Sequence, residues 1–156
     1  MNFDTERIVF ISIKPNYAFD ILNLKKKWEY RRISPQLNTR TRMMIYASGE
    51  VQAVVGDCVI SEVVQTQVKE LIDLTIAETT STREGLQEYF KGLKLGSALK
   101  LENPYRYERQ IPLSEIRERI PDFMPPQNFF YLKVGDSKLE FLFDKVVSEH
   151  KNEYIR

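Results

Sequence analysis

Closely spaced strand-like runs constrain the fold of this chain more than any other feature. Four runs are rich in β-branched and aromatic residues: IVFISI at 8–13, WEYRR at 28–32, MMIYA at 43–47 and DCVISEVVQ at 57–65. Two parallel strands need a long crossover connection, whereas antiparallel strands need only a short turn. The spacing therefore predicts an α+β domain whose mostly antiparallel sheet curls into a small barrel with flanking helices.

Helical signals interrupt these runs. Pro15 suits the first turn of a helix, and the apolar residues after it predict a helix to about residue 23. Apolar residues at three- and four-residue steps predict a second helix over 68–76. Ser81 and Glu84 form a capping box that opens a third, which Gly92 ends.

The last third of the chain returns to strand character. SALKL at 97–101 and NFFYLKV at 128–134 are expected strands, with the segment 102–113 as a loop and a short helix at 114–119. Residues 139–147 fit either a helix, opened by the capping box Ser137 and Glu140, or an alternating strand, and the helix is favoured. We predict a domain over 1–135 with a helical extension over 136–156 packed on it.

Composition limits the chemistry. The chain has 156 residues, enough for one ordered core, with a single cysteine and a single histidine. Cys58 lies in an apolar run and is expected to be buried, and His150 is expected on the surface near a helix end. These two residues are too few for a zinc site, so we predict no metal or other cofactor. The N-terminus lacks the pattern of a signal peptide and no long apolar window occurs, so a cytoplasmic protein with no membrane partner is expected.

The positive charge is concentrated in one segment. Although the net charge is only +1, residues 24–42 hold seven Lys or Arg and one acid, a local charge of +6. A local field of this kind can hold an anion even when the whole protein is almost neutral. The segment is thus a candidate phosphate-binding surface.

Within this segment, the two faces of a strand separate the aromatic from the charged residues. Side chains alternate along a strand, so Trp28 and Tyr30 share one face while Glu29 and Arg31 share the other. The aromatic pair could form a stacking platform for bases, but a strand needs one apolar face, which favours the core. Glu29 and Arg31 would then face a ligand.

Six short motifs in a fixed order resemble the ASCH domain, a β-barrel fold related to the PUA domain: SIKP at 12–15, KKWEYRR at 26–32, YAS at 46–48, VVGDCVISEV at 54–63, EYFKG at 88–92 and PPQNFFYL at 125–132. The resemblance implies a cleft beside the barrel, lined by the basic strand after the first helix. It also implies ligands that are RNA or nucleotide-like.

Some small members of this family hydrolyse an acetylated cytidine with a lysine, a threonine and a glutamate. The resemblance puts their lysine at Lys26, but their threonine position holds Lys27, and Glu62 is the nearest match for the glutamate. The nucleophile of that reaction is therefore missing at its expected place.

Two functions follow as hypotheses. The first is a binding module for RNA or a nucleotide-like ligand, which could act in RNA-linked or transcriptional regulation. Its predicted ligand-binding residues are Lys14, Glu29, Arg31, Arg32, Ser48, Tyr105 and Gln127. The second is a hydrolase of modified nucleosides or RNA with Lys26 and Glu29 as the acid–base pair. The sequence leaves open whether the chain is an enzyme. It also leaves open whether a protein partner binds the apolar stripe of the C-terminal helix.

Overall fold

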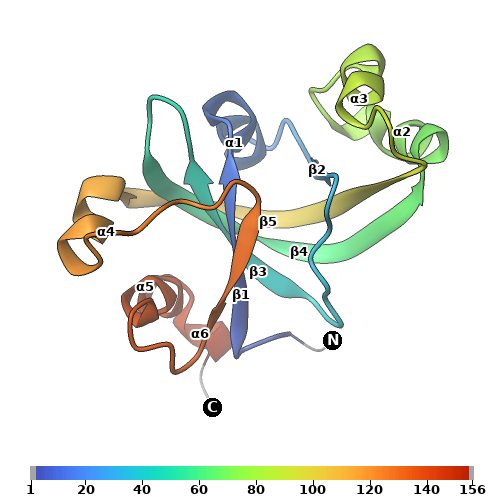
Figure 1. Cartoon of the computed structure of the whole chain (residues 1–156). Coiled ribbons are helices and arrows are strands. Elements are labelled where there is room, and N and C mark those ends of the chain that lie inside the picture. Colours follow the sequence, from blue (N-terminus) through green and yellow to red (C-terminus); the bar gives the residue numbers. More distant parts are fainter. Residues whose placement is uncertain (1–2, 155–156) are drawn as a thin grey trace.

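A single mixed sheet organises the computed structural model, which describes residues 3–154 (Figure 1). Its strands run in the order β2-β5-β4-β3-β1-β6. Their bounds are β1 Arg7–Ile13, β2 Trp28–Arg31, β3 Thr41–Ala47, β4 Ala53–Gln67, β5 Leu95–Pro112 and β6 Phe129–Lys133. The helices are α1 Pro15–Leu22, α2 Val68–Thr75, α3 Arg83–Tyr89, α4 Leu113–Arg119, α5 Glu140–Glu149 and α6 Lys151–Tyr154, with a 3₁₀ turn η1 at Ile76–Glu78.

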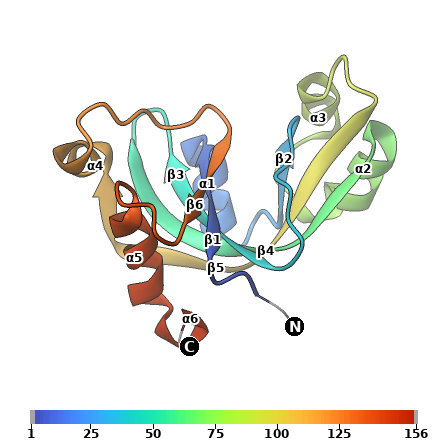
Figure 2. The same ribbon diagram turned by 60° about the horizontal axis from the view of Figure 1, so that its bottom comes forward.

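The predicted α+β class and mostly antiparallel pairing are confirmed, but the sheet does not close into a barrel. β2 and β6 are its two edges and do not pair with each other. The sheet curls instead into a trough, because the long strands β4 and β5 bend through three register shifts (Figure 2). Gly56 lies at one of these shifts, where a Cβ atom would come within 2.4 Å of the Tyr105 carbonyl oxygen.

One pair of neighbouring strands is parallel. β1 and β3 run side by side in the same direction, with Val9 opposite Met43 and Ile13 opposite Ala47. The connection between them contains α1 and β2, and β2 crosses to the far edge of the sheet to pair with β5. This detour makes the connection long enough for a parallel crossover.

Two strands are longer than the sequence predicted. β5 continues through residues 102–112, which were expected to form a loop, because Glu102, Tyr105, Arg106, Ile111 and Pro112 pair with β4. β4 correspondingly begins at Ala53 and extends to Gln67. The Tyr-Arg alternation at 105–107 is thus part of a strand.

The predicted helices are present, with two changes at their N-termini. Thr82 rather than Ser81 caps α3, since its Oγ1 accepts a hydrogen bond from the Gly85 amide. The favoured helix near the C-terminus forms as α5, but Asp136 rather than Ser137 accepts the amide hydrogen bonds that precede it. Both replacements put an equivalent oxygen one residue away from the predicted cap.

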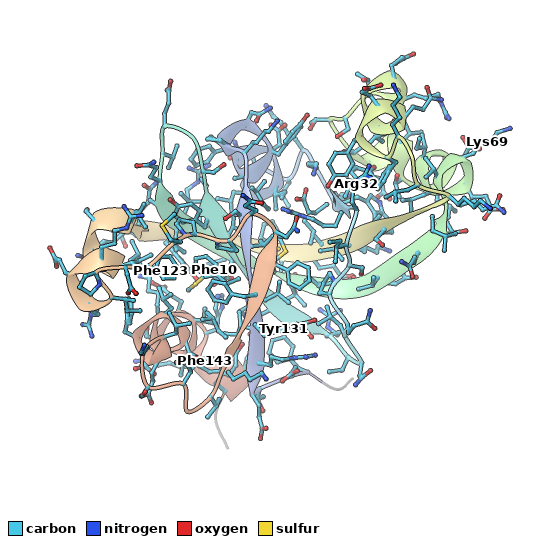
Figure 3. All side chains as sticks on the ribbon, in the orientation of Figure 1. Phe10, Arg32, Lys69, Phe123, Tyr131 and Phe143 are labelled. Carbon is cyan, nitrogen blue, oxygen red and sulfur yellow. The ribbon has the colours of Figure 1, made fainter. Side chains whose placement is uncertain are left out.

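The core has three parts. Alternate residues of β1 face opposite sides of the sheet, so Val9 packs under α1 while Phe10 packs on the other side with Phe123 and Phe143 (Figure 3). A third cluster joins β2 to the helical lobe, defined as α2, η1 and α3. The apolar stripe of α5, proposed above as a docking surface, packs on its own sheet through Leu142, Phe143 and Val146.

A buried cluster of charges fixes the C-terminal helices to the sheet. Asp57 is fully buried on β4 and accepts hydrogen bonds from Arg42 Nη1 at 2.8 Å and from the Tyr107 hydroxyl at 2.6 Å. His150 Nε2 lies 2.8 Å from Asp57 Oδ2. The prediction of a surface histidine was therefore wrong, because the docking of α5 brings its last turn against Asp57.

The predicted burial of the single cysteine is confirmed. Cys58 is wholly inaccessible on β4, and burial raises the pKa of its thiol well above the ordinary value. A neutral buried thiol acts as a small apolar side chain.

Removal of the Asp57 carboxylate tests how much this charge cluster contributes. We expect Asp57→Ala to lower the free energy of unfolding by about 3–5 kcal/mol, because the buried Arg42 would keep only the partly exposed Glu153 as a counter-charge. Urea denaturation measures the change. Asp73→Ala is the matched control, since Asp73 also lies 2.8 Å from an arginine, Arg83, but at the surface, and it should cost less than about 1 kcal/mol. Equal losses would contradict this account.

The assignment of Trp28 to the core is tested in the same way. Trp28 is 6% exposed and packs against the helical lobe. We expect Trp28→Ala to cost about 3–5 kcal/mol, as truncations of large buried aromatics do. Leu74→Ala changes a 63% exposed residue of the same lobe and should stay within about 0.5 kcal/mol of the wild type. A Trp28→Ala protein of wild-type stability would mean that this side chain faces solvent.

Candidate functional site

The trough of the sheet contains a central cavity of about 1090 Å³. Its floor comes from the end of β1, from β2 and from the end of β3. One wall is the helical lobe, and the other is α4 with residues 124–128. Figure 2 shows these two groups of elements on opposite sides of the sheet. We call the space between them the central cavity.

The cavity brings together most of the residues proposed from the sequence. Six of the seven predicted ligand-binding residues line it, namely Lys14, Glu29, Arg31, Arg32, Ser48 and Gln127. Lys26, the proposed partner of Glu29 in acid–base catalysis, also lines it. They come from four separate segments of the chain. The sequence analysis thus selected residues that converge in space.

A buried ion triad forms the floor. Lys26 Nζ lies 2.6 Å from Glu29 Oε1, and Arg31 Nη2 donates to Glu29 Oε2 at 2.7 Å. The alternation of β2 puts Glu29 and Arg31 on the same face, opposite Trp28 and Tyr30, as predicted. All three charged side chains are less than a tenth exposed, so the triad lies deep in the cavity.

The cations keep Glu29 ionised. Burial by itself would raise the pKa of Glu29, but the charges and hydrogen bonds of Lys26 and Arg31 outweigh it and lower the pKa below 4.5. Each carboxylate oxygen also accepts a hydrogen bond from one cation. Glu29 therefore orients the two cations, and its low pKa makes it a weak base.

Two polar atoms on the floor lack a hydrogen-bond partner. Arg31 Nη2 donates to the Ser12 carbonyl oxygen at 2.8 Å, while Arg31 Nε and Ser12 Oγ are buried and unpaired. Buried polar atoms are normally paired, and an unpaired donor in a cavity suits an incoming acceptor. Arg31 and Ser12 both line the central cavity, so this unmet hydrogen-bonding capacity lies next to the space that an anion would occupy.

Comparisons with known proteins identify the family of the chain. Residues 8–118 match the family described as Domain of unknown function (DUF365). A curated protein of Zymomonas mobilis subsp. mobilis, the ASCH domain-containing ribonuclease, is 30% identical over 128 residues, which cover 82% of this chain and 86% of that protein. The chain belongs to the ASCH domain family.

Solved structures support the same assignment. The crystal structure of ASCH from Zymomonas mobilis superposes with a TM-score of 0.80 at 28% identity, covering 90% of this chain and 96% of that chain. The N-terminal domain of Staphylothermus marinus McrB shares the fold alone, with a TM-score of 0.52 and 10% identity over 92% of this chain and 96% of that one. The family predicted from six short motifs is therefore confirmed.

The remaining predicted residues of this ASCH domain lie around the triad. Arg32 Nη1 donates to the carbonyl oxygens of Tyr89 and Lys91, which holds β2 to the helical lobe (Figure 3). Lys14 and Gln127 are exposed at the edge of the cavity. Ser48 is partly buried, and its hydroxyl and amide both approach the Ile13 carbonyl oxygen. These residues surround the floor without closing it.

Tyr105 and Glu62 lie outside the central cavity. The Tyr105 hydroxyl donates to Glu149 Oε2 at 2.7 Å, and its ring packs against that of His150. Glu62 is exposed on β4 beside a different, smaller cavity. The Tyr-Arg alternation in residues 105–107 thus belongs to β5, and Glu62 is not positioned to act with Lys26.

Several residues that line the central cavity were not predicted from the sequence. Tyr17, Tyr46 and Tyr89 supply aromatic rings, and Arg117 from α4 supplies a further cation. The lining holds five cations, namely Lys14, Lys26, Arg31, Arg32 and Arg117, against the two carboxylates of Glu29 and Glu88. No local signal marked Arg117, because α4 reaches the cavity only through the fold.

Other kinds of site find less support. Within residues 3–154, no group of three or more His, Cys, Asp and Glu side chains is arranged to hold a metal ion. No helix in the described part of the chain is long and apolar enough to cross a membrane.

The depressed pKa of Glu29 predicts a pH dependence. A carboxylate whose pKa is lowered by folding stabilises the fold when the pH is above its pKa in the unfolded chain, which is near 4.5. This stabilisation is lost as the pH falls through the pKa of the folded state. We expect Glu29→Gln to be destabilising at pH 7, with a difference from the wild type that shrinks steadily below pH 4.5. Urea denaturation of both proteins at pH 7, 5 and 3 measures this. A difference that is the same at all three pH values would contradict the ionised state of Glu29.

Proposed function

We propose that this ASCH domain binds single-stranded RNA in the central cavity and cleaves its phosphodiester backbone. The observation that carries the proposal is the buried Arg31, whose Nε is unpaired on the floor of a cavity with more cations than carboxylates. A phosphate group is the acceptor that arginine binds most readily. The 30% identical relative is named a ribonuclease, which favours RNA as the source of that phosphate.

The size and lining of the cavity favour a single strand. A volume of about 1090 Å³ admits a few nucleotides, and the rings of Tyr17, Tyr46 and Tyr89 line it. Unpaired bases can stack on aromatic side chains, whereas the bases of a duplex are already stacked on one another. Cations near the backbone and aromatic rings near the bases are the combination that binds single-stranded nucleic acid.

The triad supplies the groups that cleavage needs. In this proposal the 2′-hydroxyl attacks the neighbouring phosphorus, the bond from phosphorus to the 5′ oxygen breaks, and the products are a 2′,3′-cyclic phosphate and a 5′-hydroxyl. Arg31 and Lys26 stabilise the negative charge that develops on the phosphate oxygens. Positioned cations are the main source of rate acceleration.

Lys26 and Glu29 keep the acid–base roles suggested by the sequence. Glu29 takes the proton of the 2′-hydroxyl through a remaining lone pair, and Lys26 gives a proton to the departing 5′ oxygen. A proton then returns from Glu29 to Lys26 across the 2.6 Å contact between them. The low pKa of Glu29 limits its strength as a base, so we assign it the smaller effect.

A second candidate is hydrolysis of acetylated cytidine, the reaction of small relatives. The observation in its favour is the unpaired Ser12 hydroxyl, which lies beside Arg31 and could replace the missing threonine as nucleophile. RNA binding without cleavage, in a regulatory role, is the third outcome. These alternatives use the same cavity, and one set of assays separates them.

Cleavage of labelled single-stranded RNA tests the proposal. We expect RNA to be cut to fragments with 2′,3′-cyclic phosphate ends, and the same sequence with 2′-deoxyribose to stay intact. Arg31→Gln should lower the rate about 10²–10³-fold, because it removes the charge that stabilises the transition state. Arg119→Gln is the control for a lost arginine outside the central cavity and should cleave at the wild-type rate.

The other outcomes select between the alternatives. Intact RNA that is still bound, with an affinity that falls as salt rises, supports the binding module. Release of acetate from acetylated cytidine, abolished by Ser12→Ala, supports the second candidate. A thermal melt of Arg31→Gln shows whether its fold is intact. Absence of both cleavage and salt-dependent binding would contradict the proposed function.

A further inference from the structure

We propose that Arg117 is a second phosphate-binding residue, opposite Arg31, and that the substrate is therefore an RNA segment with at least two phosphates. This inference rests on the proposed function and specifies its substrate class. It excludes a free nucleoside or a mononucleotide as the preferred ligand. Three features of the structure support it: the position of Arg117, its unpaired charge and the volume of the central cavity.

The two arginines belong to opposite sides of the same cavity. Arg31 lies on β2, beside the helical lobe, and Arg117 lies in the last turn of α4. Figures 1 and 2 show β2 and α4 at opposite ends of the trough, and both residues line the central cavity. A ligand that touches both must cross the floor.

Arg117 is held in place but not neutralised. Its Nε donates to the Phe123 carbonyl oxygen at 3.0 Å, and its Nη2 has only a weak contact with Met124 Sδ at 3.7 Å. Among the described residues, no carboxylate forms an ion pair with it. Its remaining N–H donors are therefore available to a ligand, and the Phe123 contact orders the side chain in advance.

Neighbouring arginines do not share these features. Arg109 forms an ion pair with Glu115 at 2.5 Å. Arg119 lies 4.8 Å over the ring of Phe141 and lines a separate cavity between α4 and α5. Of these three arginines, Arg117 alone lines the central cavity.

Tyr46, at the end of β3 on the cavity floor, adds a neutral donor close enough to feel the charge of Arg117. Burial raises the pKa of Tyr46 and the charge of Arg117 opposes this shift, so the hydroxyl stays protonated near neutral pH. It is 2% exposed and lines the cavity. A phosphate beside Arg117 can therefore accept hydrogen bonds from a cation and a hydroxyl together.

The cavity has room for more than one nucleotide. Its volume of about 1090 Å³ is at the upper limit of pockets that enclose a drug-sized ligand, roughly 300–1,000 Å³. Because Arg31 and Arg117 lie on opposite sides of the cavity, we expect one phosphate to engage one arginine and the next phosphate of the same strand to engage the other. This favours an internal segment of a chain over a mononucleotide.

Binding of short oligonucleotides tests the inference. The probes are 2′-O-methyl oligouridylates with one to four phosphates, which cannot be cleaved through the 2′-oxygen, in competition with a labelled longer strand. We expect the wild-type affinity to rise steeply from one phosphate to two. Arg117→Gln should weaken binding about tenfold for two or more phosphates and leave binding of one phosphate unchanged.

The salt dependence separates a phosphate contact from a structural role. Loss of one contact to single-stranded RNA should reduce the slope of log affinity against log salt by about 0.7. Arg117→Lys keeps the charge and should retain most of the slope, whereas Arg119→Gln should match the wild type throughout.

Three results would overturn the inference. The first is that Arg117→Gln binds the probes as tightly as Arg119→Gln does. The second is that Arg117→Gln weakens the affinity for one phosphate and for several phosphates equally. The third is that Arg117→Lys loses as much affinity as Arg117→Gln and also loses thermal stability. In each case the proposed function would stand, because the wild type still binds. A wild type that binds none of the probes or the labelled strand at low salt would overturn both.

Discussion

The burial of β2 on both faces is the constraint on which the rest of the structure depends. β2 is a short edge strand, and all four of its residues are buried. One face needs an apolar cover, which the helical lobe provides over Trp28 and Tyr30. The other face carries Glu29 and Arg31, whose charges need partners inside the protein. β2 therefore joins the packed core on one face to the charged floor of the central cavity on the other.

Two buried ion clusters lie on this sheet, and they differ in whether their arginine lines the central cavity. Asp57 is surrounded by Arg42, Tyr107 and His150, and this cluster fixes the C-terminal helices in place. It keeps an unpaired nitrogen, Arg42 Nε, but Arg42 does not line the central cavity. The Glu29 triad also leaves one nitrogen unpaired, Arg31 Nε, but Arg31 lines the central cavity. This difference in access is our reason for assigning structure to the first cluster and chemistry to the second.

The fold alone does not decide between these functions, since one fold can carry many unrelated activities. Membership of the ASCH family and the likeness to a protein named a ribonuclease make RNA the natural ligand to test. The lining of the cavity adds what the family name leaves out, which is where phosphates would lie. In our proposal, Arg31 and Arg117 bind two of these phosphates, and the tyrosines that line the cavity stack on bases.

The sequence by itself determined the features that depend on local spacing. The period of two placed Trp28 and Tyr30 opposite Glu29 and Arg31, Pro15 marked the start of α1, and the order of six motifs identified the family. Tertiary structure decided the rest, because contacts between distant segments have no local signal. The pairing of β4 with β5 turned an expected loop into strand, the docking of α5 placed the partly buried His150 against Asp57, and the return of α4 to the trough brought Arg117 to the cavity. Each of these outcomes depends on residues far apart in the chain that gain free energy only when the whole sheet has formed.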